Sequence, residues 1–153
     1  MTLVVVGTEH FDALVAELDR LVAVGRLPPD AFGQIGSGQY VPRHFPWVRY
    51  EPDLWQRFAA ADLIVTHGGT GLVTECIVSG RPFIAVPDPL KPENHQLEFL
   101  EALTERFDFC WVREPAQLEA ALPHARPARR KDGLDVQQLA NDILAFVTHA
   151  AGG

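Results

Sequence analysis

Glycines, a histidine and a carboxylate are concentrated in one stretch, Thr66 to Glu75, which reads THGGTGLVTE. This stretch follows the apolar run Leu63 to Val65 and precedes a helical pattern, so its glycines are predicted to form a turn from a strand into a helix. Such a turn can bind an anion, because glycines let the backbone approach a phosphate and the first helical N–H groups have no internal partner. The stretch therefore predicts either a phosphate-binding loop or a purely structural turn.

Glu75 comes about one turn into the same predicted helix. A carboxylate there can accept both hydroxyls of a ribose whose phosphates rest on the helix start, as acidic residues do in dinucleotide-binding folds. It can equally be a solvated carboxylate on an exposed helix face. The stretch has no GK[ST] ending and is not a GxGxxG on the first strand, so a Walker A loop is excluded and NAD is disfavoured.

A second polar segment, Val86 to Gln96, joins a predicted strand to the start of a helix. Its three prolines stiffen the backbone at low entropic cost. His95 and Gln96 can form hydrogen bonds with sugar hydroxyls, whereas Asn94 is suited to capping the helix as well as to contacting a ligand.

Strands and helices are predicted to alternate along the chain. Strands are expected at 3–6, 31–35, 46–50, 63–65, 83–86 and 109–112. Helices are expected at 11–22, 52–61, 71–79 and 94–106, with a short one opened by Pro115, a polar connection over 123–133 and an amphipathic helix over 135–149. This alternation predicts an α/β fold, a Rossmann-like parallel sheet with helices on both faces that binds ligands beyond the carboxyl ends of its strands. Three glycine-bearing segments are expected at that edge: Gly7-Thr8, 36–38 and 68–71.

Composition narrows the function classes. A length of 153 residues predicts one domain, 1–153. A net charge of −7, with no basic run longer than Arg129 to Lys131, argues against nucleic-acid binding. Cys76 and Cys110 form no CxxC motif and favour a reducing compartment. No apolar stretch approaches the ~20 residues of a membrane span, and no signal peptide is recognisable, so we expect a soluble cytoplasmic chain.

Taken together, the segments between Thr66 and Leu103 resemble the C-terminal domain of family 28 glycosyltransferases, in particular the small catalytic subunits of two-part N-acetylglucosaminyl and exopolysaccharide transferases. The resemblance rests on the order HxGTG, a glutamate soon after, GxPxIxVP and then NHQ. The opening, Val4 to Val15, also resembles the first strand and helix of that domain. The resemblance is weaker over 26–45 and after 112.

The resemblance implies one half of a two-domain GT-B fold, an inverting mechanism and no metal or other cofactor. It implies that the glycine turn holds the pyrophosphate of a UDP-sugar, through Gly68, Gly69, Thr70 and Gly71. It implies that Glu75 binds the ribose, and that the sugar meets Asn94, His95 and Gln96. It also implies that Tyr50 and Glu51 line the uracil, through backbone groups, and that Gly7 and Thr8 face the interdomain cleft.

His67 has two interpretations: a catalytic group that helps the leaving group depart, or a structural histidine at a strand end. In two-domain members of the family the base that deprotonates the acceptor lies on the other domain. The resemblance therefore implies a membrane-associated partner subunit that supplies this base and the acceptor site, and that recruits the chain to the inner face of the membrane. In the absence of that partner, a homodimer is the alternative assembly. The helix over 135–149 is expected either to dock the partner or to cover the chain's own core.

The expected function is that of a hexosyltransferase, active with its partner, which transfers a sugar from a UDP-sugar to a lipid-linked acceptor in polysaccharide or glycolipid synthesis. The alternative is a non-catalytic nucleotide-sugar-binding or regulatory module on the same half-fold, because a fold alone does not determine a function.

Overall fold

The computed structural model describes residues 1–7, 9–90, 95–133 and 145. Its main sheet has six strands, every one parallel to its neighbours, in the order β3-β2-β1-β4-β5-β7. The strands are β1 (Thr2–Val5), β2 (Phe32–Gln34), β3 (Trp47–Val48), β4 (Leu63–His67), β5 (Phe83–Val86) and β7 (Cys110–Trp111). The predicted parallel α/β fold is confirmed.

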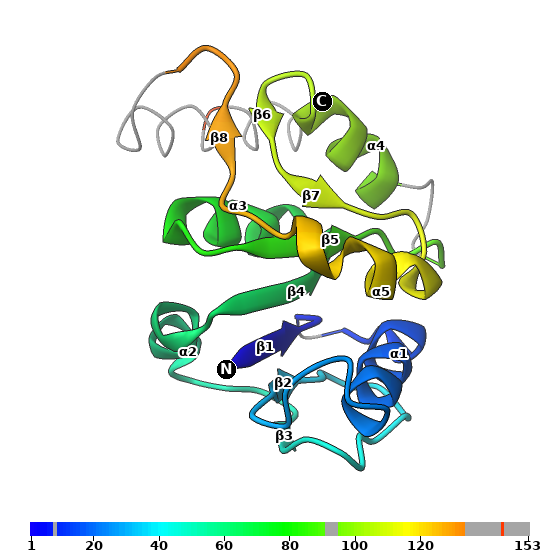
Figure 1. Cartoon of the computed structure of the whole chain (residues 1–153). Helices are drawn as coiled ribbons and strands as arrows, with labels where there is room; N and C mark the ends of the chain where they lie inside the picture. The colour runs from blue at the N-terminus through cyan, green and yellow to red at the C-terminus, as the bar shows by residue number, and fades with distance from the viewer. Residues whose placement is uncertain (8, 91–94, 134–144, 146–153) are drawn as a thin grey trace.

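Helices cover both faces of this sheet (Figure 1). They are α1 (Asp12–Ala23), α2 (Leu54–Ala60), α3 (Thr70–Ser79), α4 (His95–Leu103) and α5 (Leu118–Ala121), with 3-10 turns η2 (Pro115–Gln117) and η3 (Leu122–His124) beside α5. Side chains alternate along each strand, so Val4 packs with α1 and α5 on one face while Leu3 and Val5 pack with α2, α3 and α4 on the other. Burial on both faces explains the uninterrupted apolar runs of β1 and β5.

The strand order reverses between β1 and β4. Leu3 of β1 lies opposite Phe32 of β2 on one side and opposite Ile64 of β4 on the other. From β1 the chain first builds outward through β2 and β3, and then returns to start β4 on the opposite side. In open α/β sheets the crevice that takes a ligand lies at such a reversal, outside the carboxyl ends of the strands. The loops after β1 and β4 are therefore the first place to look for a site.

A buried carboxylate fixes the long loop between β2 and β3. Asp19 lies on the core face of α1 and is only 2% exposed. It accepts hydrogen bonds from the Tyr40 hydroxyl (2.6 Å), from the backbone N–H of Arg43 (3.1 Å) and from that of His44 (2.8 Å). Burial by itself would raise the pKa of Asp19, but these hydrogen bonds outweigh it and hold the pKa below its ordinary value. The loop is thus attached to α1 without secondary structure of its own.

The carboxyl-terminal third of the described chain corrects the sequence prediction. The strand expected at 109–112 is present as β7, but two short strands are found that the pattern did not predict: β6 (Phe107–Asp108), just before β7, and β8 (Arg129–Arg130), in the polar connection. β6 and β8 form an antiparallel pair, with Phe107 opposite Arg130. Two-residue strands are too short to show a periodicity, which is why the sequence pattern missed them. The helix expected to reach residue 106 ends at Leu103, and the one expected over 135–149 lies outside the described residues apart from residue 145.

Within the described ranges, no helix is both long enough and apolar enough to cross a membrane.

Gly36 gives a stability test of the loop arrangement at the carboxyl edge. Its φ is +62°, and a Cβ at this position would lie 1.8 Å from the carbonyl oxygen of Glu9. We expect Gly36→Ala to lower the free energy of unfolding by about 2–5 kcal/mol, the sum of left-handed backbone strain and overpacking. The measurement is urea denaturation.

Gly25→Ala is the matched control for this measurement. Gly25 has a φ of +77°, and a Cβ there would meet nothing within 4 Å. It should therefore lose only the backbone strain, about 1–2 kcal/mol. An equal loss of unfolding free energy in the two variants would contradict the close packing of the loop after β2 against the loop after β1.

Candidate functional site

The turn from β4 into α3 is packed too closely to admit side chains. A Cβ on Gly69 would lie 2.2 Å from Cε1 of the His67 ring, and one on Gly68 would lie 3.1 Å from the Cβ of Gln96. Gly69 is the N-cap of α3 and has an extended backbone (φ −65°, ψ 138°). Glycine is required here because a histidine ring and another helix occupy the space where side chains would project.

His67 is the last residue of β4, and its ring folds back over the turn. Its Nδ1 accepts a hydrogen bond from the backbone N–H of Gly69 at 3.1 Å. Its Nε2 lies on the side of Gly7, where a Cβ would be 3.1 Å away. Within the described part of the chain this Nε2 has no hydrogen-bond partner, so one nitrogen of the ring remains open between the loops after β1 and β4.

Gln96 joins three segments with one side chain. Its Oε1 accepts hydrogen bonds from the backbone N–H groups of Gly68 (3.1 Å) and Asp88 (2.9 Å). Its Nε2 lies 3.2 Å from Nδ1 of His67. The end of β4, the loop after β5 and the start of α4 are thereby held together by one amide. A residue predicted to contact a sugar is thus largely engaged inside the protein.

Glu75 lies one turn into α3, on the exposed side of the helix. Val73, Cys76 and Ile77 form the buried face of α3, and Gly80 (φ +71°) ends it. Partial burial raises the pKa of the Glu75 carboxyl above its ordinary value. Within the described residues no protein group donates a hydrogen bond to this carboxylate, and a hydroxyl-bearing ligand on this helix could do so.

The other half of the edge is organised by a second glutamine, Gln34, which is buried. It is 2% exposed, its Nε2 donates to the carbonyl oxygen of Gly7 (3.3 Å), and its Oε1 accepts from the backbone N–H of Glu51 (2.9 Å). Beside it lies a cavity of about 310 Å³ lined by Gly36, Ser37, Arg49 and Tyr50. The loops after β1, β2 and β3 thus form one connected unit with an open hollow at its rim.

The model of the glycosyltransferase family 28 C-terminal domain matches residues 1–132. The chain belongs to this family. The expected family, and with it the resemblance carried by the glycine turn and the NHQ segment, is confirmed.

Among curated relatives of this family 28 domain, the UDP-N-acetylglucosamine transferase subunit ALG13 of Homo sapiens is 31% identical over 111 residues, which make up 65% of this chain and 10% of that protein. The UDP-N-acetylglucosamine–N-acetylmuramyl-(pentapeptide) pyrophosphoryl-undecaprenol N-acetylglucosamine transferase of Solibacter usitatus is 40% identical over 75 residues, 48% of this chain and 19% of that protein. The chain thus spans less than a fifth of the length of either relative.

Solved structures show the same fold. MurG of Acinetobacter baumannii superposes with a TM-score of 0.54 at 19% identity, covering 93% of this chain and 49% of that one. The solution structure of ALG13 superposes with a TM-score of 0.50 at 17% identity, covering 82% of this chain and 87% of that one. The expected architecture, a single GT-B half-domain, is confirmed by this likeness, which at such identities concerns the fold alone.

The family 28 domain brings most of the predicted site residues to one edge. His67, the glycine turn and Gln96 touch one another directly, and Gly7 faces His67. Tyr50, 64% exposed, lines the 310 Å³ cavity at the end of β3. His95 is exposed at the start of α4, while Thr8 and Asn94 lie outside the described residues.

Two backbone groups expected to face the ligand are engaged elsewhere. The N–H of Gly68 donates to Gln96, and that of Gly69 donates to His67. The next three N–H groups, those of Thr70, Gly71 and Leu72, occupy the first positions of α3 and have no acceptor within the helix. An anion at this turn would therefore meet the helix start rather than the two glycines before it. Similarly, the N–H of Glu51 is taken by Gln34, and its carboxylate is paired with Arg57 at 3.2 Å.

Sequence reasoning missed Gln34 and Asp88. Gln34 is a polar residue in an otherwise apolar buried strand, a signal that could have marked it as a hydrogen-bonding centre. Asp88 is 4% exposed, and its Oδ1 accepts from the backbone N–H of Leu90 (3.0 Å). It was read only as part of a proline-stiffened loop, because nothing in the local sequence indicates burial.

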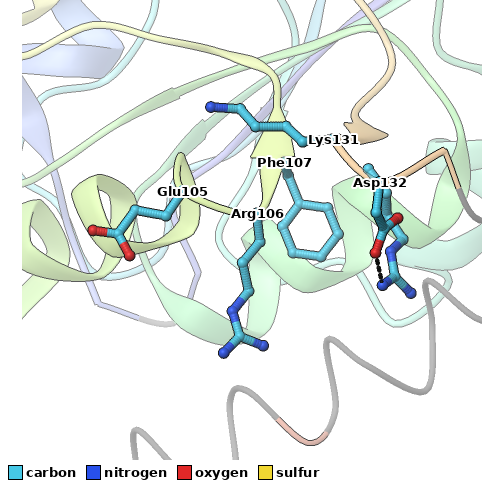
Figure 2. Close-up of a pocket in the computed structure, with 6 residues that line it drawn as sticks. Glu105, Arg106, Phe107, Lys131 and Asp132 are labelled. Carbon is cyan, nitrogen blue, oxygen red and sulfur yellow. Dashed lines mark hydrogen bonds and ion pairs between the residues drawn. The ribbon is translucent and has the colours of Figure 1, made fainter.

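A further pocket lies away from this edge, near the far end of α4 from Gln96 (Figure 2). Its volume is about 270 Å³, and it is lined by Glu105, Arg106, Phe107, Arg130, Lys131 and Asp132. Arg130 and Asp132 form an ion pair. Figure 2 shows Glu105, Arg106 and Lys131 pointing in different directions, so these charges do not converge on one ligand position.

The protonation of His67 is testable on the free chain. Burial lowers the pKa of its imidazole from the ordinary value near 6.5. We expect the ring to titrate below 6.5 when its carbon resonances are followed by NMR across pH, with a His67→Asn variant for assignment.

The lowered pKa of His67 also determines how the free energy of unfolding changes with pH. Below pH 6.5 the unfolded chain takes up a proton on this residue that the folded chain does not, so the contribution of His67 to the free energy of unfolding falls as the pH drops toward the folded pKa. A midpoint at or above 6.5 would contradict the buried, neutral ring.

Proposed function

We propose that this chain is the donor-binding, catalytic subunit of a two-component inverting glycosyltransferase. It transfers a hexose-type sugar from a UDP-sugar to a lipid-linked acceptor in polysaccharide synthesis, including exopolysaccharide, or in glycolipid synthesis, without a metal or other cofactor. The observation that carries the proposal is that Nε2 of His67 and the first N–H groups of α3, which have no acceptor within the helix, both lie at the strand-order reversal of a family 28 domain.

The names of the relatives support the donor, the acceptor class and the partner. ALG13 is a subunit of a UDP-N-acetylglucosamine transferase. The Solibacter usitatus enzyme transfers N-acetylglucosamine to a sugar carried on pyrophosphoryl-undecaprenol. A UDP-sugar, a lipid-linked acceptor and a second subunit are therefore the components that we propose for this chain.

The pyrophosphate is proposed to rest on the start of α3. The N–H groups of Thr70, Gly71 and Leu72, together with the positive end of the helix dipole, favour a dianionic group there. During transfer the bond between the sugar and the β-phosphate breaks, and negative charge grows on the departing phosphate. Donors already fixed at that point stabilise the charge without reorganisation, which is how such a site accelerates the reaction.

The ribose and base are proposed to extend from the helix start to the hollow beside Tyr50. Glu75 accepts hydrogen bonds from the two ribose hydroxyls. The uracil enters the 310 Å³ cavity at the ends of β2 and β3. The sugar lies toward His95 and the amide of Gln96, at the start of α4.

The remaining parts are proposed to come from a membrane-associated partner. It supplies the base that deprotonates the acceptor hydroxyl and the surface that holds the lipid, and it brings this chain from the cytoplasm to the inner face of the membrane. A homodimer is the alternative assembly when the partner is absent.

Donor binding gives the first test. We expect UDP to bind the chain in calorimetry, ADP to bind far more weakly, and Glu75→Ala to weaken UDP binding by about 1–3 kcal/mol, since the ribose hydroxyls lose a charged acceptor. Glu98→Ala, which removes another exposed carboxylate, from α4, is the control and should bind UDP as the unmodified chain does. Equal affinity for UDP in the Glu75 and Glu98 variants would contradict the ribose assignment.

Transfer gives the second test. The chain co-purified with its partner should move radiolabelled sugar from a UDP-sugar to a polyprenyl-linked acceptor, with inversion at the anomeric carbon and no loss of rate in EDTA. Tight binding of UDP with no transfer in that complex would instead favour a non-catalytic nucleotide-sugar-binding module.

A further inference from the structure

Gln96 is placed so that its amide has only one orientation. Two backbone N–H groups, of Gly68 and Asp88, point at the same atom from 3.1 and 2.9 Å. Only the amide oxygen can accept both, because the amide nitrogen would direct its own hydrogens at them. The oxygen therefore faces the two loops, and the nitrogen must face His67, 3.2 Å from its Nδ1.

This orientation determines where the imidazole of His67 carries its proton. Nδ1 receives one N–H from the Gln96 amide and another from the backbone of Gly69 at 3.1 Å. A hydrogen on Nδ1 would face both donors, so Nδ1 must be the unprotonated acceptor nitrogen. A neutral ring with a bare Nδ1 has its hydrogen on Nε2.

The Nε2–H so defined lies between the loops after β1 and β4. On the side of Gly7 the backbone comes close to it, since a Cβ at that position would lie only 3.1 Å from Nε2. The side chain of Leu72 borders the same space, with its Cδ1 3.7 Å from that position. The first turn of α3 begins directly after this ring, at Thr70. The ring thus adds one more uncharged donor to the helix start.

We propose that Gln96 is a positioning residue, which holds His67 in the Nε2–H tautomer and so directs a neutral N–H donor at the phosphate oxygens of a nucleoside diphosphate. The ligand in this inference rests on the proposed function, whereas the tautomer rests on the contacts of the free chain alone.

The length and charge of the side chain at position 96 are both necessary. Asparagine is one methylene shorter and cannot reach the two loops and His67 at once. Glutamate has the right length and still accepts from Gly68 and Asp88. Its second oxygen, however, would face Nδ1 and attract a proton to it, which reverses the tautomer or charges the ring.

The test is nitrogen-15 NMR of the histidine rings in the free chain, compared with Gln96→Glu. In the unmodified protein we expect a bare Nδ1 and a protonated Nε2 at His67. In Gln96→Glu we expect a proton on Nδ1 and a higher pKa for the ring. A ring protonated on Nδ1 in the unmodified protein overturns the proposal by itself, whether or not the variant folds, and so does a variant with an unchanged ring.

Gln117→Glu is the matched control. The Oε1 of Gln117 also accepts two backbone N–H groups, from Arg113 (2.9 Å) and Glu114 (3.0 Å), at the start of η2. The same chemical change is made there without a histidine partner, and the His67 resonances should not move.

UDP titration of the chain, alone and with its partner, separates this inference from the proposed function. Binding that shifts Nε2 of His67 and that weakens about tenfold in Gln96→Glu, but not in Gln117→Glu, supports both. Binding that leaves the His67 ring unaffected overturns the role of Gln96 and His67 toward the ligand and leaves the proposed function standing. No binding in either preparation overturns the proposed function and the ligand part of this inference together, while the ring tautomer is still decided by the free chain.

Discussion

The carboxyl edge of the sheet depends on hydrogen bonds from two glutamine side chains. Where parallel strands end, their backbone N–H and C=O groups lose their partners in the neighbouring strands, and burying them unpaired is costly. Gln34 satisfies such groups at Gly7 and Glu51, and Gln96 satisfies them at Gly68 and Asp88. Loops that would otherwise need water are thereby held at fixed positions by groups that are part of the protein.

These hydrogen bonds change how the glycine-rich turn between β4 and α3 is interpreted. From the sequence, the glycines suggested that a backbone comes close to a phosphate. In the structure, the space around Gly68 and Gly69 is filled by Gln96 and by the His67 ring, and their N–H groups donate to these two side chains. The glycines make room for Gln96 and the His67 ring, while the first turn of α3 and Nε2 of His67 are the groups that we propose to meet a ligand. The two glycines and the first turn of α3 are thus adjacent in sequence but have different structural roles.

The sequence predicted correctly those strands and helix ends that show as a local pattern of residues. The apolar runs of β1, β4 and β5 follow from burial on both faces, and the end of α3 follows from Gly80. It could not predict contacts made across long separations in the chain. Asp19 looks like a solvated residue interrupting an apolar stripe, yet it is buried because a loop more than 20 residues later supplies its donors. The partner of Gly68 was hidden for the same reason, since Gln96 lies 28 residues away. The β6–β8 pair was missed because its strands are too short for any periodicity.

The two glutamines have a mechanical consequence for the whole edge. The edge has two halves: hydrogen bonds of Gln34 join the loops after β1 and β3, and those of Gln96 join the loops after β4 and β5. Among the described residues, the halves meet between Gly7 and His67 through packing alone, without a hydrogen bond. A ligand at this seam would contact both halves, each held by its own glutamine. Its affinity would then depend on the distance between the two halves, and a mutation that shifts one half would change the fit of every ligand bound there.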